Sequence, residues 1–184
     1  MVSPKKILLT TSRNPTPRIR AFCKDLVRTI PSIMSVNRGK MSMDEVAEKA
    51  LERDADRVVI IDRWHGGPGS IKFFRVSQSG LDLISPVIHI AGLRLQREFG
   101  VTKIKPARSM VILESNTKGE VLRVAEAFSK FFNVPILSLD EAFQVGPTQM
   151  CVSLGKGHRI VMTFMVEPNR VEVGPQIVVS SVEW

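Results

Sequence analysis

The chain has 184 residues, 43% of them hydrophobic, which is enough for one ordinary domain or two small halves that share a core. No apolar run approaches the length that spans a membrane, and we expect no signal peptide because the N-terminus lacks an apolar segment. The formal net charge is +8, from 26 basic and 18 acidic residues, so a polyanion is a candidate partner.

Residues 7–11 predict a buried strand, because three aliphatic residues are followed by two β-branched threonines. Asn14-Pro15 ends this strand, and Thr16 before Pro17 is typical of the N-cap and first residue of a helix. The apolar residues of that helix fall on one side at helical spacing, namely Ile19, Phe22, Cys23, Leu26 and Ile30.

The first half continues as alternating elements. Its predicted elements are a strand at 33–36, a helix at 43–53 begun by the capping box Ser42-x-x-Glu45, an interior strand at 57–62, a loop at 64–69 and a returning hairpin strand at 71–76. The predicted order is βαβαββ, with parallel strands joined by crossovers and an antiparallel addition.

The second half is richer in strands. Its predicted elements are a strand at 83–90 interrupted at Pro86, a strand or short helix at 91–99, a linker at 101–106, a strand at 109–113, a helix capped by Thr117-x-x-Glu120, a strand at 135–137, a short helix begun by Ser138-x-x-Glu141, and strands at 149–154, 158–166 and 171–182. The segments TTSRNPTP and LESNTKGE both join a strand to a helix, which is a weak internal echo.

Several kinds of chemistry find no support in the sequence. Phosphate-cradling P-loops and dinucleotide fingerprints are absent, as are nucleophile and zinc motifs, so we expect no cofactor, no metal and no enzymatic activity. Cys23 and Cys151 are far apart and predict buried free thiols in a reducing, cytoplasmic compartment. His65 is the one histidine in a setting where acid–base catalysis stays open, with a hydrogen bond in the turn as the alternative.

The excess of basic over acidic residues is confined to the start of the chain. The first 40 residues hold nine basic residues and a single acidic one, Asp25, so the remaining 17 basic and 17 acidic residues cancel. Phosphate contacts in nucleic-acid complexes come from such side chains. The predicted RNA-binding residues are Arg13, Arg18, Arg20, Lys24, Arg38 and Lys40, with Arg63 and Trp64 as lesser candidates.

Two alternatives remain open for these residues. Arg20, Lys24 and Arg28 are spaced as one face of the first helix, which is also typical of an ordinary solvated face. Trp64 is a candidate for stacking on a base or for a half-buried hairpin anchor. The sequence contains no tyrosine and no evident stacking platform, so we expect recognition of RNA backbone and shape.

Three segments resemble, in order and spacing, the Brix domain family of ribosome-biogenesis proteins. They are LLTTSRNPTPRIRAFCKDL, SIMSVNRG and VVIIDRWHGGPGSIKFF, and the clear match covers about the first ninety residues. The resemblance implies an α/β (mixed α+β) fold of two similar halves, each like the anticodon-binding domain of class II aminoacyl-tRNA synthetases. The expected domain is residues 1–184, with halves at approximately 1–100 and 101–184.

The resemblance also implies a ribosome-biogenesis factor that binds precursor rRNA, acting with ribosomal or other assembly proteins and away from membranes. The chain lacks the charged extensions common in eukaryotic members and looks like a minimal, archaeal-type version. A stand-alone tRNA-binding module and an RNA-modifying enzyme are the alternatives. The rRNA segment, the subunit matured, the protein partners and the oligomeric state are not specified by the sequence.

Overall fold

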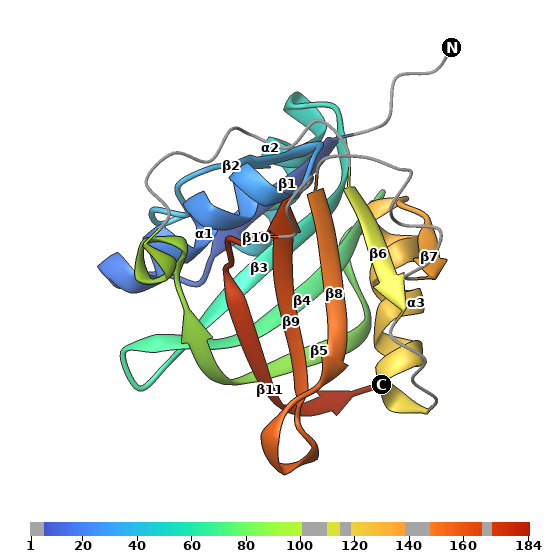
Figure 1. The fold of residues 1–184 in the computed structure, drawn as a ribbon. Helices are drawn as coiled ribbons and strands as arrows, with labels where there is room; N and C mark the ends of the chain where they lie inside the picture. The colour runs from blue at the N-terminus through green and yellow to red at the C-terminus, as the bar shows by residue number, and fades with distance from the viewer. Residues whose placement is uncertain (1–5, 101–109, 115–118, 139–147, 167–170) are drawn as a thin grey trace. The chain divides into compact units, whose positions relative to one another are not determined.

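The computed structural model describes residues 6–100, 110–114, 119–138, 148–166 and 171–184, shown in Figure 1. The chain divides into two compact units. The described part of unit 1 comprises residues 6–27, 32–89 and 182–184, and unit 2 comprises the described parts of 28–31 and 90–181. The fold is mixed α/β, as the sequence predicts.

The elements of unit 1 follow the βαβαββ prediction, with a further strand added. They are β1 (Lys6–Thr11), α1 (Pro17–Thr29, whose last residues belong to unit 2), β2 (Ile33–Ser35), α2 (Met43–Glu52), β3 (Ala55–Trp64), β4 (Gly67–Ser77) and β5 (Gly80–Arg94, which continues into unit 2). The strand order is β2-β1-β3-β4-β5. Strand β1 is parallel to both β2 and β3, and the β3–β4 and β4–β5 pairs are antiparallel.

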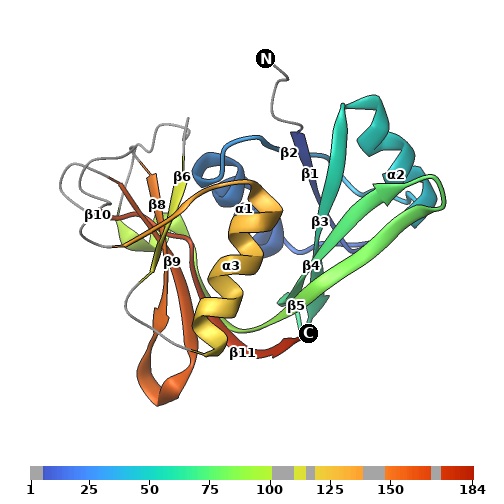
Figure 2. The same ribbon diagram turned by 90° about the vertical axis from the view of Figure 1, so that its right-hand side faces the viewer.

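The centre of unit 1 is β1, which has a neighbour on each side and a helix over each face. Leu8 packs with Val46 and Ala50 of α2 in one buried cluster. Ile7 and Leu9 are also buried and, since side chains alternate along a strand, they point to the opposite face. Figure 2 shows α1 and α2 on opposite faces of this sheet.

The predicted helix starts in unit 1 are confirmed, because both depend on local chemistry. The Ile19 N–H donates to Thr16 Oγ1 at 3.4 Å, which is the expected N-cap of α1. At α2 the Glu45 N–H donates to Ser42 Oγ at 3.1 Å, and the Ser42 N–H donates to Glu45 Oε2 at 2.6 Å. This is the reciprocal capping box.

The predicted loop at 64–69 is wrong. Strand β3 extends to Trp64, which pairs with Gly67, so only His65 and Gly66 form the turn. Both have positive φ, 43° and 83°, as a two-residue hairpin turn of the right twist requires. At the adjoining bulge Gly69 lies so close to β3 that a Cβ there would meet Trp64 Cβ at 2.3 Å.

The predicted interruption at Pro86 is also wrong, because β5 runs through it as one strand of 15 residues. The register passes from the pair Phe73–Ile84 to the pair Ile71–Ile88. Residues 85–87 therefore form a bulge, which takes the proline, with no N–H to donate, out of the ladder. Beyond β5, residues 96–99 form a short 3-10 helix, η1 (Gln96–Phe99), so the helix alternative for 91–99 is partly confirmed.

The elements of unit 2 are β6 (Met110–Glu114), α3 (Glu120–Phe132), β7 (Ile136–Ser138), β8 (Thr148–Leu154), η2 (Lys156–His158), β9 (Ile160–Val166), β10 (Val171–Glu172) and β11 (Gln176–Glu183). Their order is β7-β6-β8-β9-β11, with β10 beside β9. Strand β6 is parallel to both β7 and β8, while β8–β9 and β9–β11 are antiparallel. The predicted single strand at 171–182 is thus two strands.

Helix α3 supplies much of the unit 2 core. Its inward residues agree with the prediction, and all are buried, namely Val121, Val124, Ala125, Phe128, Phe131 and Phe132. Its N-cap is Gly119, so the predicted cap at Thr117 is wrong. The predicted linker at 101–106 and short helix after Ser138 lie outside the described residues. Both cysteines are free, Cys23 buried and Cys151 only half-buried.

Candidate functional site

The connections of unit 1 create a crevice at the carboxyl ends of β1 and β2. The chain leaves β1 toward α1 on one face of the sheet and leaves the neighbouring β2 toward α2 on the other face. Where two adjacent parallel strands send their connections to opposite faces, the loops part and leave a crevice, the usual ligand position in open α/β sheets. A pocket of about 710 Å³ lies at this point.

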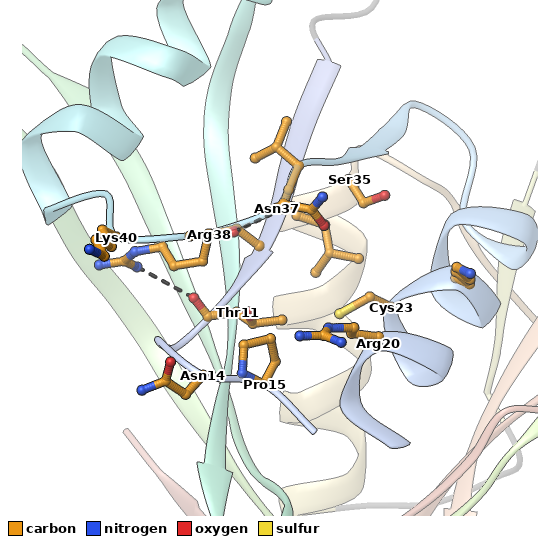
Figure 3. Close-up of a pocket in the computed structure, with 14 residues that line it drawn as sticks. Thr11, Asn14, Pro15, Arg20, Cys23, Ser35, Asn37, Arg38 and Lys40 are labelled. Carbon is orange, nitrogen blue, oxygen red and sulfur yellow. Dashed lines mark hydrogen bonds between the residues drawn. The ribbon is translucent and has the colours of Figure 1, made fainter. Parts of the chain in front are cut away.

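We call this pocket the basic crevice. It is lined by Leu9, Thr10, Thr11, Asn14, Pro15, Arg20, Cys23, Lys24, Ser35, Val36, Asn37, Arg38, Gly39 and Lys40. Four of these residues are cationic, and no aspartate or glutamate is among them. Figure 3 shows Arg20 and Cys23 of α1 on one side of the crevice and Arg38 and Lys40 on the other, with Thr11 between them.

Backbone and side-chain hydrogen bonds fix the two strand ends that form the crevice. Thr10 Oγ1 donates to the Val36 carbonyl oxygen at 3.0 Å. The Val36 N–H donates to the Leu9 carbonyl oxygen at 2.9 Å. The end of β2 is therefore held against the end of β1, so the spacing of the crevice walls is set by the fold.

Arg38 is a buried part of the wall, with only 7% of its surface exposed. Its Nε donates to the Met41 carbonyl oxygen at 2.7 Å, and its Nη1 donates to the Thr11 carbonyl oxygen at 3.5 Å. Burial lowers the pKa of the guanidinium, the charge of Arg13 lowers it further, and Asp62 and Glu45 oppose both effects. An anion in the crevice would offset this unfavourable burial of positive charge.

Arg63 supports the turn that carries Arg13. The Ser12 N–H donates to the Ile61 carbonyl oxygen at 2.9 Å, and the Arg63 N–H donates to Ser12 Oγ at 3.1 Å. Arg63 Nη1 also donates to the Asn14 carbonyl oxygen at 3.2 Å. The Arg63 side chain thus positions one edge of the crevice and remains exposed itself.

The other predicted residues, Arg13, Arg18 and Trp64, are not among the residues given above as lining the crevice. Arg13 is exposed between β1 and α1, and Arg18 is half-buried in the first turn of α1. Trp64 is 69% exposed and meets His65 edge-on with ring centroids 4.7 Å apart. The interpretation of Trp64 as a half-buried hairpin anchor is therefore wrong, and its indole is open to solvent.

In the part of the chain that the structure describes, no carboxylate pairs with the exposed cations around the crevice. Within the described residues, none of Arg13, Arg20, Lys24 and Lys40 takes part in an ion pair, and all four are exposed. Asp62, the carboxylate at the end of β3, is paired with Lys72 at 2.6 Å. The local field is consequently positive, as the distribution of charge along the sequence indicates.

Ten of the fourteen lining residues are absent from the predicted site, and Asn14, Cys23, Ser35 and Asn37 are among them. Asn14 and Asn37 follow the ends of predicted strands and Ser35 lies near the end of one, but only the parallel pairing of β1 and β2 brings these three together. Cys23 lies on the buried side of α1, where burial raises its pKa to about 12. It is therefore a neutral thiol near pH 7.

The described part of the chain has neither a metal-binding cluster nor a membrane-spanning helix. No group of three or more histidine, cysteine, aspartate or glutamate side chains there is arranged to hold a metal ion. None of the described helices combines the length and apolarity that crossing a membrane requires.

Searched against models of known families, the chain matches none. A protein from Aeropyrum pernix named "Probable Brix domain-containing ribosomal biogenesis protein" is 34% identical over 122 residues, covering 65% of this chain and 67% of that protein. A protein of the same name from Pyrobaculum aerophilum is 29% identical over 174 residues, or 93% and 90%. One from Pyrococcus horikoshii is 33% identical over 127 residues, and this chain spans 56% of its length.

Solved structures are similar over nearly the whole chain. The crystal structure of a probable ribosomal biogenesis protein from Aeropyrum pernix superposes with a TM-score of 0.80 at 29% identity, covering 96% of each chain. That of Mil, an archaeal Imp4-like protein, gives 0.68 at 21% identity, covering 96% of this chain and 98% of that one. The second likeness concerns the fold alone.

Proposed function

The chain belongs to the Brix domain family, and on that premise we propose that it is a ribosome-assembly factor that binds precursor rRNA through the basic crevice and the cations around it. The proposed role is to hold folded RNA, without chemistry on it. Ribosomal or other assembly proteins are the proposed further partners.

The observation that carries this proposal is the convergence of cations at one edge of unit 1. Arg20 and Lys24 reach the crevice from α1 and Lys40 from the connection after β2, and no carboxylate of the described residues lines it. Phosphate oxygens are contacted by such side chains in nucleic-acid complexes, and these contacts position the protein without reading sequence. The positive electrostatic field of these cations also speeds the association of the protein with a polyanion.

The proposal extends to the two halves expected from the family. In unit 1 a central strand is parallel to two neighbours, and the next strand along is antiparallel. Unit 2 repeats these pairings, with β6 in the place of β1. This agreement supports the interpretation that the units are related halves.

The test is the salt dependence of binding to a structured rRNA fragment. If about five phosphates are neutralised, the logarithm of the association constant should fall with the logarithm of salt concentration at a slope of roughly −3 to −4. An association constant that does not change with salt concentration would contradict the proposal. A tRNA measured under the same conditions serves as control, and tighter binding to tRNA than to rRNA would favour a tRNA-binding module instead.

A further inference from the structure

The basic crevice has features that contact with a phosphate backbone does not require. Backbone contact needs only exposed cations, whereas this site is concave and has apolar lining behind its charges. Leu9 and Cys23 are 0% and 6% exposed, and Pro15 and Val36 are half-buried. These four are the apolar members of a lining that is otherwise mostly polar or cationic, and the volume of the crevice falls within the roughly 300–1,000 Å³ of clefts that bind small organic ligands.

A second observation comes from Thr11, the last residue of β1. Thr11 is 6% exposed, and its Oγ1 is buried with no hydrogen-bond partner among the described residues. A buried hydroxyl without a partner costs free energy, and such groups are rare in folded proteins. Thr11 lines the crevice, so a ligand there could supply the missing partner.

The remaining polar groups of the crevice suit the two ends of a nucleotide. Arg20, Lys24 and Lys40 are cations that match a phosphate. Asn14 and Asn37 carry side-chain amides, each able to donate and accept hydrogen bonds as base edges and ribose hydroxyls require. Figure 3 shows Asn37 above the crevice and Asn14 below it, with Arg20 and Lys40 on opposite sides.

We propose that the basic crevice encloses one whole nucleotide of the bound RNA, with its phosphate among the cations and its base or ribose against the apolar lining and Thr11 Oγ1. This inference rests on the proposed function and adds to it a ligand of defined chemistry, a nucleoside phosphate. An unstacked nucleotide from a loop, bulge or strand end fits this description, because its base is free to leave the helix.

The first test needs no RNA. The full chain is titrated with 5′-AMP, with 5′-UMP and with inorganic phosphate, and backbone amide shifts are followed by NMR. We expect at least one nucleotide to bind at least about tenfold more tightly than phosphate, with shifts at residues 9–15 and 35–40. Equal affinity for phosphate and both nucleotides, or shifts elsewhere, overturns the proposal even if RNA binding itself is confirmed.

The second test uses two variants of the crevice and a control. Thr11→Val keeps the shape and removes the hydroxyl, so it should bind the nucleotide about threefold to tenfold more weakly without loss of thermal stability. Ser35→Leu places bulk at an exposed position of the crevice, and Ser180→Leu places the same bulk at an exposed strand position of unit 2. Of the two leucine variants, only Ser35→Leu should weaken nucleotide binding.

The same variants show whether the nucleotide bound in the crevice is part of the RNA or a free small molecule. If the nucleotide belongs to the RNA, Thr11→Val and Ser35→Leu should weaken rRNA binding several-fold while the salt slope stays that of the unchanged protein. Nucleotide binding with unaltered RNA affinity in both variants would assign the crevice to a free nucleotide and overturn this inference. Failure of the unchanged protein to bind rRNA would instead contradict the proposed function.

Discussion

Arg38 donates from Nη1 to the carbonyl oxygen of Thr11, at 3.5 Å, and both residues line the basic crevice at the carboxyl ends of β1 and β2 (Figure 3). The residues are 27 positions apart in the sequence. A cation that could be taken for a surface residue is therefore part of the framework, and the exposed cations beside it remain available to a ligand.

Replacing Arg38 by Met should destabilise the fold. The change removes donors to the carbonyl oxygens of Met41 and Thr11, and we expect the free energy of unfolding to fall by about 2–3 kcal/mol in urea denaturation. Lys40→Met is the matched control, because Lys40 is exposed, and it should change stability by no more than about 0.5 kcal/mol. Equal losses in both variants would contradict the framework role of Arg38.

Reversing two charges at the crevice should abolish RNA binding without unfolding the protein. The double variant Arg20→Glu, Lys24→Glu changes exposed side chains on α1 that have no ion pair within the described structure. Lys130→Glu with Arg159→Glu alters the net charge equally at exposed positions of unit 2. In a filter-binding assay the first variant should no longer bind RNA, and the second should bind it as the unchanged protein does. Similar affinities for both variants would argue against a localised site.

Removing the Trp64 indole should affect RNA binding more than stability. The side chain is 69% exposed, so Trp64→Ala should leave the melting temperature nearly unchanged. Stacking of a base on an aromatic ring contributes about 1–3 kcal/mol, so rRNA affinity should fall about fivefold or more. Leu83→Ala, at another exposed apolar residue of unit 1, serves as the control and should bind as the unchanged protein does.

The capping box of α2 should make stability depend on pH. Its hydrogen bonds with Ser42 lower the pKa of Glu45 below the ordinary 4.5, and Arg13 and Arg38 lower it further. The stabilisation is therefore complete above pH 4.5 and disappears as pH falls through the lower pKa of the folded state. The stability gap between the unchanged protein and Glu45→Gln should shrink from about pH 7 to about pH 3, whereas a constant gap would exclude the effect.

Features set by neighbouring residues could be predicted from the sequence. The capping box of α2 joins Ser42 to Glu45, three positions apart, and the start of α1 follows from Thr16 and Pro17. The interruption predicted at Pro86 is wrong because it, too, was inferred from neighbouring residues alone. Proline locally disfavours a strand, but a bulge in the β4–β5 register allows β5 to continue through it. Local rules contain no information about such pairing.

The candidate site could be predicted in part. Charge distribution pointed to Arg20, Lys24 and Lys40, which the structure brings to one pocket. The burial of Arg38 and the exposure of Trp64 depend on which strands pair and where the hairpin turns, and neither is encoded by charge or spacing. The RNA contacts predicted for these residues remain to be tested.

Strand β1 is buried at five successive positions, from Ile7 to Thr11. The exposed residues that follow this buried run therefore begin beyond the end of the strand, with Arg13 and Asn14. Substitutions beyond that point can alter what the protein binds while leaving the centre of the sheet intact. Substitutions at such surface positions carry little risk to folding.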